Sequence, residues 1–262
     1  MTVIALQDIV CVTPQRISTT WDELDWAYGS KGSGWGFPGS AISLWAGSPG
    51  VGKTRLIVEL AKRMDQSGKT VLIFQGEVSP QQFKSEKMMD YVPISGIWIS
   101  SDVAIDEQMK IIQELKPDLV ITDSVQQVDE YQGGRGAKLL VNKMKKAISY
   151  GGHVIFISQL TAEGKTAGGN KLPHFVDILC SVDNYITKSI FKIEIMKNRC
   201  GVNGRWVIFE HHNEGVICAS EGGKALRWRD VDWIETHVPP APFAVPPAPQ
   251  RPWWKMLFSI FL

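Results

Sequence analysis

The chain has 262 residues, enough for one or two domains, and 44% of them are hydrophobic, which suffices for a sizeable core. Its 28 Lys and Arg residues nearly balance its 27 Asp and Glu residues, which gives a formal net charge of +1. This balance excludes binding to nucleic acid through bulk charge, so any such binding must use a local patch or the lining of a pore.

The N-terminal residues do not have the features of a targeting segment. They lack the basic stretch followed by a long apolar run that a secretory signal requires. No part of the chain reaches the roughly 18 consecutive apolar residues of a membrane span. We therefore expect a soluble, cytoplasmic protein.

Short apolar runs alternate with amphipathic stretches through the body of the chain. The runs at 41–45, 71–74, 119–122 and 154–157 have the composition of strands that are buried on both faces of a parallel sheet. Helices are predicted at 54–66, 105–115 and 138–149, and Gly68 follows the first of them as a stop signal. This alternation predicts an α/β fold with a mostly parallel central sheet and helices on both of its faces.

Beyond residue 190 the pattern changes to hairpins, with strand-like runs at 191–197 and 205–211 around a glycine turn at 201–204. We expect an antiparallel extension of the sheet there. We assign residues 1–238 to one domain, 239–252 to a proline-rich linker of polyproline II type, and 253–262 to an apolar tip.

The apolar tip at 253–262 has three interpretations. An apolar peptide on a proline tether is typical of a docking segment for a replication or repair partner, and this is our first expectation. The tip could instead fold back onto its own body and shield apolar surface. As a short helix it could also lie on a membrane surface, although a single lysine gives little support to that interpretation.

The strongest motif is a phosphate-binding loop that matches G-x-x-x-x-G-K-[ST] in full, after a predicted strand and before a predicted helix. Its glycines let backbone N–H groups turn toward phosphate oxygens, and the helix N-terminus adds partial positive charge. Lys53 is expected to reach the β- and γ-phosphates of ATP, and the Thr54 hydroxyl to ligate Mg²⁺. The nucleotide-binding residues are therefore Gly47, Ser48, Pro49, Gly50, Val51, Gly52, Lys53 and Thr54.

Two carboxylates follow predicted strands. Asp123 ends the run at 119–122, and ligands of parallel sheets bind at the carboxyl ends of strands, so we expect it to hold Mg²⁺ through water. Glu77 follows the run at 71–74, where a carboxylate can orient and deprotonate the water that attacks the γ-phosphate. A turn cap and a solvated loop residue are the respective alternatives.

Gln159 ends the fourth strand-like run and is expected to link the γ-phosphate to the loop that follows it. The glycine-rich loops after Asp123 and after Gln159 carry Arg135 and Lys165. Isolated cations on glycine loops suit backbone contacts to single-stranded DNA. Ordinary surface loops fit this composition equally well.

Two further cations, Lys197 and Arg199, are two residues apart, a spacing that places side chains on one face of a strand. If this face meets the nucleotide of a neighbouring subunit, Arg199 would act as an arginine finger and Lys197 would complete the site. The alternative is a solvated strand face.

Together these motifs resemble those of RecA-like ATPases, over roughly residues 17–217. The segments TWDELD at 20–25 and GFPGS at 36–40, the phosphate loop, Gly76-Glu77 and KPDLVITDS at 116–124 occur in the family's order. The similarity is greatest to the ATPase core of the RadA (Sms) DNA-repair proteins, whose signature Lys-Asn-Arg-Phe-Gly resembles 197–201 with Cys200 in place of phenylalanine. Residues 161–164, 167–168 and 174–177 resemble further RadA motifs, and 158–160 also resembles DnaB-type helicases.

The chain departs from the RadA pattern in three respects. RadA proteins begin with a four-cysteine zinc module, but the four cysteines here form no C-x-x-C pair, so we expect no zinc and no disulfide framework. The proline-rich tail stands where RadA proteins have a Lon-protease-like domain. Ala162 stands where a lysine is usual.

The resemblance implies a RecA-like ATPase that uses ATP and Mg²⁺ and forms a ring-shaped homo-oligomer, a hexamer, around single-stranded DNA. It implies a motor or remodelling role in recombination, repair or branch migration, in a bacterium or a phage. A DnaB-like replicative helicase, a nucleotide-gated assembly protein of KaiC-like type and an accessory subunit that binds ATP without turnover remain alternatives. A small-molecule phosphotransferase would need an arginine-rich lid, which we do not find.

Overall fold

A computed structural model describes residues 15–30, 32, 34–125, 136–160, 172–184, 190–212 and 215–218. The chain divides into two compact units, residues 1–226 and 227–262, and all described residues lie in the first. The linker at 239–252 and the tip at 253–262 lie outside the described residues, so the domain boundaries assigned from the sequence stay a prediction.

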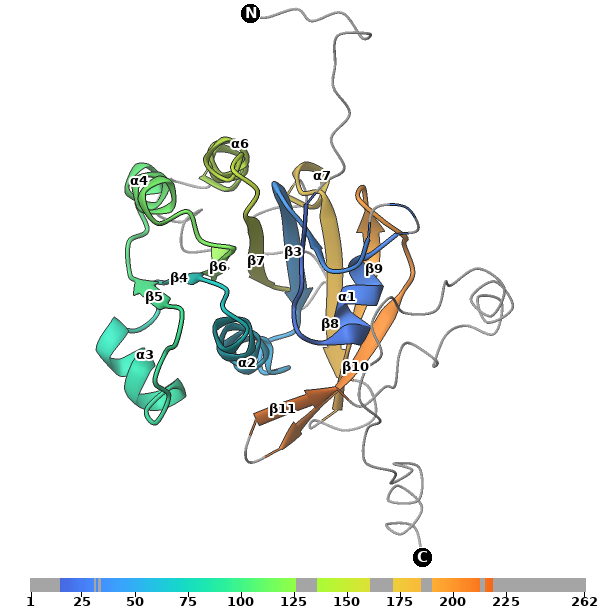
Figure 1. Cartoon of the computed structure of the whole chain (residues 1–262), viewed down its shortest axis with the longest axis horizontal. Helices are drawn as coiled ribbons and strands as arrows, with labels where there is room; N and C mark the ends of the chain where they lie inside the picture. The colour runs from blue at the N-terminus through green and yellow to red at the C-terminus, as the bar shows by residue number, and fades with distance from the viewer. Residues whose placement is uncertain are drawn as a thin grey trace, which may run out of the picture. The chain divides into compact units, whose positions relative to one another are not determined.

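Nine strands form one sheet in the order β11-β10-β9-β8-β3-β7-β6-β4-β5 (Figure 1). Neighbours from β8 to β5 pair in parallel, whereas β8–β9, β9–β10 and β10–β11 pair antiparallel. The strands are β3 (Ala41–Gly47), β4 (Val71–Gln75), β5 (Ile97–Ser100), β6 (Leu119–Asp123), β7 (His153–Gln159), β8 (Ile178–Asn184), β9 (Ile190–Asn198), β10 (Trp206–His212) and β11 (Gly215–Cys218). A separate antiparallel pair consists of β1 (Arg16–Ile17) and β2 (Phe37–Pro38).

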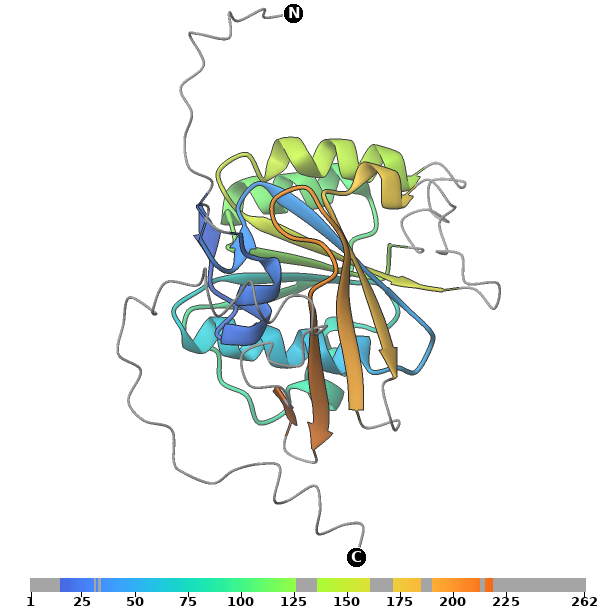
Figure 2. The same cartoon turned by 90° about the vertical axis from the view of Figure 1, so that its right-hand side faces the viewer.

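Helices cover both faces of the sheet, and each face has its own buried apolar cluster. One cluster joins the sheet to α1, α2 and α3, and the other joins it to α4, α6 and α7. Figure 2 shows the yellow-green α6 above the sheet and the blue-cyan α2 below it. The helices are α1 (Asp22–Tyr28), α2 (Lys53–Gln66), α3 (Pro80–Lys87), α4 (Ile105–Leu115), α6 (Gly136–Ala147) and α7 (Leu172–Phe175). The predicted RecA-like α/β architecture, with its antiparallel extension, is thereby confirmed.

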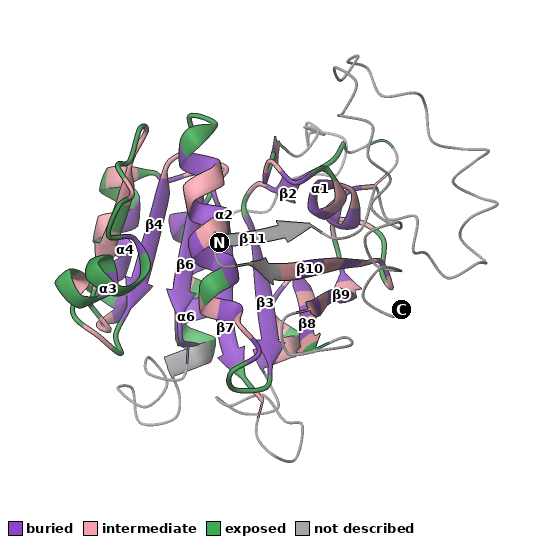
Figure 3. Cartoon of the chain, turned by 90° about the horizontal axis from the view of Figure 1, so that it is seen from below, coloured by how far each residue is buried: buried purple, intermediate pink, exposed green. Residues whose placement is uncertain are grey.

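The central strands are buried along their length, as their continuous apolar runs predict (Figure 3). The prediction for 105–115 matches α4, but the helix predicted at 138–149 begins and ends two residues earlier, at Gly136–Ala147. No strand was predicted at β8, in which buried and half-buried residues alternate. The edge strand β5 and the polar helix α3, whose single buried residue is Phe83, were not predicted either.

Two of the motifs that carry the family resemblance contact each other. The buried carboxylate of Asp25 accepts hydrogen bonds from the Ser18 hydroxyl and the Thr19 amide, both at 2.7 Å, and burial raises its pKa. The Gly36 amide donates to the Asp25 carbonyl at 2.9 Å. A Cβ at Gly36 would lie 2.5 Å from the Ile17 carbonyl oxygen, so only glycine fits there. These residues are therefore structural.

His153 belongs to a buried polar network near the amino ends of the strands. Its Nδ1 lies 2.8 Å from the Pro38 carbonyl oxygen, which can only accept, so Nδ1 carries the proton and Nε2 accepts from the Ser43 hydroxyl at 2.9 Å. The ring also stacks on Phe37. Burial lowers the pKa of His153 from 6.5 to about 4; the hydrogen bond to Pro38 and the charge of Asp177 oppose this shift, and the charge of Arg16 adds to it.

This shift predicts acid sensitivity. The unfolded chain takes up a proton at His153 below about pH 6.5, whereas the folded chain does so only near pH 4. The contribution of His153 to the free energy of unfolding is therefore largest above about pH 6.5 and falls as the pH drops toward 4. The loss should approach ~3 kcal/mol. Denaturant titrations of the wild type and His153→Gln at about pH 7.5 and about pH 4.5 measure it. The variant should lose less stability on acidification, and an equal loss in both proteins would contradict this assignment.

Candidate nucleotide site

The phosphate loop connects β3 to α2 at the carboxyl edge of the sheet. Ser48, Pro49 and Gly50 are exposed, whereas Val51 is packed in the core. Gly50 and Gly52 have φ of 76° and 97°, the left-handed region that glycine adopts without strain. The first turn of α2 carries no acidic side chain and Gly52 provides no side-chain cap, so its backbone N–H groups remain for an anion.

The Lys53 ammonium folds back over this loop. Its Nζ donates to the carbonyl oxygens of Gly47 at 2.7 Å and Ser48 at 2.8 Å. Burial lowers the pKa of Lys53, and the negative charges of Asp123 and Asp183 oppose this shift. Among the described residues, the Lys53 ammonium donates its hydrogen bonds to neutral carbonyls, which a phosphate oxygen can replace.

Thr54 and Asp123 form the pair expected of a Mg²⁺ site. The Thr54 hydroxyl donates to Asp123 Oδ2 at 2.8 Å across the gap between α2 and β6. Burial raises the pKa of Asp123, the charge of Glu77 raises it further, and the hydrogen bond from Thr54 opposes both. Hydroxyl and carboxylate oxygens are hard donors, so the two residues fit a Mg²⁺ ion that accompanies a nucleotide.

Glu77 lies just past the carboxyl end of β4, beside β6. It is exposed and forms no hydrogen bond or ion pair with any residue that the structure describes. The segment that carries it is ordered, because Gln75 Oε1 accepts from the Val78 amide at 3.0 Å and Ser79 caps α3. A small pocket opens here, lined in part by Gln75, Gly76, Asp123 and Ser124.

Gln159 ends β7 directly beside the phosphate loop. It is paired in register with Gly47, and the following Leu160 amide donates to the Gly47 carbonyl at 3.1 Å. The residue thus lies where a contact with a bound nucleotide was expected. Arg135 and Lys165, the candidates for DNA contacts, lie outside the described residues, so their roles stay predictions.

Lys197 and Arg199 lie at the amino edge of the sheet, where the parallel strands begin. The phosphate loop lies at the carboxyl edge, where these strands end. Their strand β9 runs antiparallel to β8, and its last residue, Asn198, pairs with Ile178 at the amino end of β8. The expectation that both lie on one strand is wrong for Arg199, which belongs to the turn after β9. A bulge in the β8–β9 pairing adds one residue just before Lys197 and interrupts the alternation of side chains between Ile195 and Lys197.

Both cations bind the chain around α7 instead. Lys197 Nζ donates to the carbonyls of Pro173 and Val176, and Arg199 Nη2 donates to the carbonyl of His174. Burial and the charges of Arg199 and Lys145 lower the pKa of Lys197.

Sequence reasoning missed two acidic residues that act on the candidate cations. The charge of Asp183 on β8 opposes the lowering of the pKa of Lys53, and Asp177 forms an ion pair with Arg199. Asp177 belongs to a recognised motif, but nothing in the sequence indicates its partners. Asp183 has no local signal, because β8 itself was not predicted.

Gly47→Ala tests the packing of the loop. A Cβ at Gly47 would lie 2.1 Å from the Val182 carbonyl oxygen, so backbone must move, and we expect a loss of about 1–3 kcal/mol of stability with weaker ATP binding. Gly50→Ala is the matched control, because a Cβ there meets nothing within 4 Å and only its positive φ adds strain. Denaturant unfolding and ATP titration measure both variants. Equal stability of Gly47→Ala and the wild type would contradict this contact.

The chain is similar to curated bacterial proteins that are named for DNA repair. The chain is 28% identical over 199 residues to the DNA repair protein RadA of Mycolicibacterium smegmatis, which covers 72% of this chain and 43% of that protein. It is 26% identical over 225 residues to RadA of Campylobacter jejuni (83% and 49%) and 27% identical over 221 residues to RadA of Streptococcus pneumoniae (81% and 51%). No family model matches the chain.

These similarities confirm the resemblance to RecA-like ATPases and to RadA proteins. The chain spans about half the length of the curated relatives it matches. Among the described residues, no helix combines the length and the apolar character that crossing a membrane requires.

Proposed function

We propose that this chain hydrolyses ATP at the subunit interfaces of a ring-shaped homo-oligomer and uses it to move or remodel DNA in recombination, repair or branch migration. The observation that carries the proposal is the cluster of Lys53, Thr54, Asp123 and Glu77 at one edge of a RecA-like sheet. Similarity to proteins named for DNA repair supports the DNA role.

Each residue has a role in this proposal. The triphosphate enters the exposed loop, and Lys53 exchanges its two carbonyl contacts for phosphate oxygens. Thr54 and Asp123 would hold Mg²⁺, which neutralises phosphate charge when bound. Glu77 accepts the proton of the attacking water, and Gln159 contacts the γ-phosphate from the end of β7.

The position of the two candidate finger residues supports a site shared between subunits. Because Lys197 and Arg199 lie at the far edge of the sheet from their own phosphate loop, they can complete only the site of another copy. A contact that joins two different edges is heterologous, and repeating it produces a ring or a filament. We propose the closed ring, a hexamer, with single-stranded DNA contacted by Arg135 and Lys165.

The C-terminal tip at 253–262 is proposed to bind a replication or repair partner, and the chain to act in the cytoplasm. Deleting 253–262 should then leave ATP hydrolysis intact while abolishing capture of that partner. A loss of ATP hydrolysis on deletion would instead favour a tip that supports the body of the chain.

The test combines sedimentation with ATPase measurements, with and without single-stranded DNA. We expect ATP-dependent oligomers and hydrolysis that single-stranded DNA stimulates, and Lys53→Ala should abolish hydrolysis. Monomers at saturating ATP would overturn the ring. Oligomers that ignore DNA would favour a KaiC-like assembly protein, and unwinding of a forked duplex without branch migration would favour a DnaB-like helicase.

A further inference from the structure

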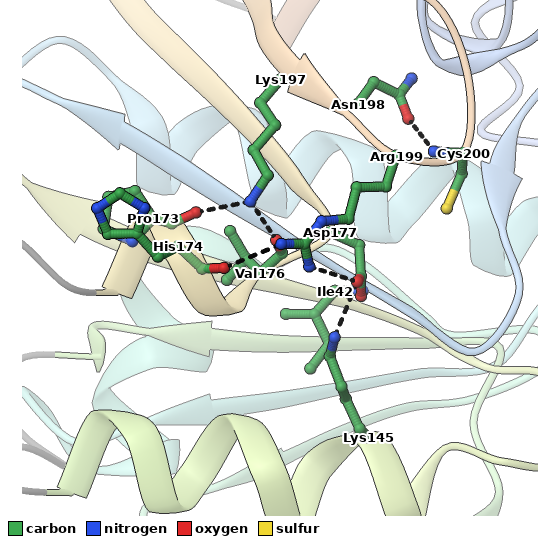
Figure 4. A network of polar contacts seen from close by, with 10 residues as sticks. All are labelled: Ile42, Lys145, Pro173, His174, Val176, Asp177, Lys197, Asn198, Arg199 and Cys200. Carbon is green, nitrogen blue, oxygen red and sulfur yellow. Dashed lines mark hydrogen bonds and ion pairs between the residues drawn. The ribbon is translucent and has the colours of Figure 1, made fainter.

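The two candidate finger residues are held in different ways (Figure 4). Lys197 Nζ donates to the carbonyl oxygens of Pro173 at 2.8 Å and Val176 at 2.7 Å, on either side of the end of α7. Arg199 Nη2 donates to the His174 carbonyl at 3.2 Å, and its side chain is 53% exposed. Lys197 therefore supports α7, whereas Arg199 is the cation that can reach a group outside its own subunit.

Arg199 forms a long ion pair with a nearby carboxylate. Its Nη1 is 3.6 Å from Asp177 Oδ1, too far for a hydrogen bond. Two other groups donate to the Asp177 carboxylate. Lys145 Nζ donates to the same Oδ1 at 2.8 Å, and the Ile42 amide donates to Oδ2 at 3.1 Å.

Lys145 comes from the last turn of α6, a different element from Arg199, and it competes with Arg199 for one oxygen. The guanidinium fork of arginine binds a carboxylate through two parallel hydrogen bonds when both oxygens are accessible. With Lys145 on Oδ1, Arg199 does not make this arrangement and stays 3.6 Å from that oxygen.

We propose that Lys145 is a positioning residue for the arginine finger, because it occupies Asp177 and so leaves Arg199 available to a phosphate that a second copy of this chain presents. The inference rests on the proposed shared site. Without Lys145, Arg199 forms a close ion pair with Asp177, so a smaller fraction of subunits has an Arg199 side chain available. Turnover falls in proportion to that fraction.

The decisive variants are Lys145→Met and the same variant combined with Asp177→Asn. Lys145→Met should lower kcat about tenfold with KM for ATP nearly unchanged, since the finger acts in the transition state. Adding Asp177→Asn should restore most of the lost rate, because asparagine keeps an acceptor for the Ile42 amide but no longer attracts Arg199 as a charge. If Lys145→Met lowered the rate by damaging the fold, the double variant would lose further activity and would not regain it. Lys145→Arg, which keeps a cation on Asp177, should retain the rate.

Lys143→Met is the matched control. Lys143 lies on the same helix, its side chain is 35% exposed against 36% for Lys145, and it pairs with Asp106 rather than Asp177. Its loss should leave kcat unchanged. Circular dichroism and sedimentation of every variant establish that fold and assembly are retained.

Arg199→Ala separates this inference from the function on which it rests. If Arg199→Ala leaves turnover unchanged, the shared site fails and the inference fails with it. If Arg199→Ala lowers turnover but Lys145→Met does not, or if Asp177→Asn restores nothing, only the role of Lys145 is overturned.

Discussion

Replacing Glu77 by Gln is expected to lower kcat for ATP hydrolysis by about 10²–10⁴-fold while ATP affinity stays near the wild-type value. The carboxylate is exposed and forms no hydrogen bond with a described residue, so it remains available to a water molecule. Glu77 follows β4 and Asp123 ends the neighbouring parallel strand β6, and the charge of Glu77 raises the pKa of Asp123, the proposed Mg²⁺ ligand. Glutamine keeps the size of the side chain but accepts no proton at neutral pH.

Single-turnover hydrolysis and equilibrium ATP binding, measured on the same preparations, test this expectation. Glu86→Gln is a suitable control, because Glu86 is an exposed carboxylate on α3 that bonds only to its neighbours Gln82 and Lys87 among the described residues. Equal hydrolysis by the wild type and Glu77→Gln would mean that Glu77 is no base. Such a result, at a low absolute rate, would favour the accessory subunit that binds ATP without turnover.

Arg199→Ala should lower turnover by about 10³–10⁵-fold, the range of arginine fingers in other phosphoryl-transfer enzymes. Arg199 and Lys53 lie at opposite edges of one sheet. In the proposed ring, a variant at Arg199 and a variant at Lys53 would therefore affect opposite sides of each subunit interface. Mixing Arg199→Ala subunits with Lys53→Ala subunits should therefore recover hydrolysis, because some interfaces then combine an intact loop with an intact finger.

The recovery must appear only when the two proteins are mixed before assembly, and it must rise to a maximum at intermediate ratios. Mixing either variant with itself is the control. If co-assembled rings show no recovery, both residues act within one subunit, and the arrangement of edges would need another explanation.

The parts of the fold that sequence reasoning predicts are those in which a local pattern decides the structure. The continuous apolar runs of β4 and β6 favour buried strands, and the periodic apolar residues of α4 favour a helix. The phosphate loop and Asp123 belong to the same class, because motif and strand end occur together in the sequence. The geometry between Thr54 and Asp123 follows from this placement.

The rest depends on contacts between distant segments. Arg199, Asp177 and Lys145 meet only because the turn after β9, the residue before β8 and the end of α6 converge on one edge of the sheet. The inference that Lys197 and Arg199 lie on one strand is wrong for Arg199, because β9 ends at Asn198 and a turn follows. The convergence has no local sequence signal.

In the proposed ring, the separation of Arg199 from its own phosphate loop would give each subunit one end that carries Arg199 and another that carries the phosphate loop. Two joined subunits would then contain one complete catalytic interface and two unfinished ends, whereas a closed assembly would contain as many complete interfaces as chains. Activity per chain should accordingly rise steeply with protein concentration until closure and then level off, so that dilution alone would abolish hydrolysis.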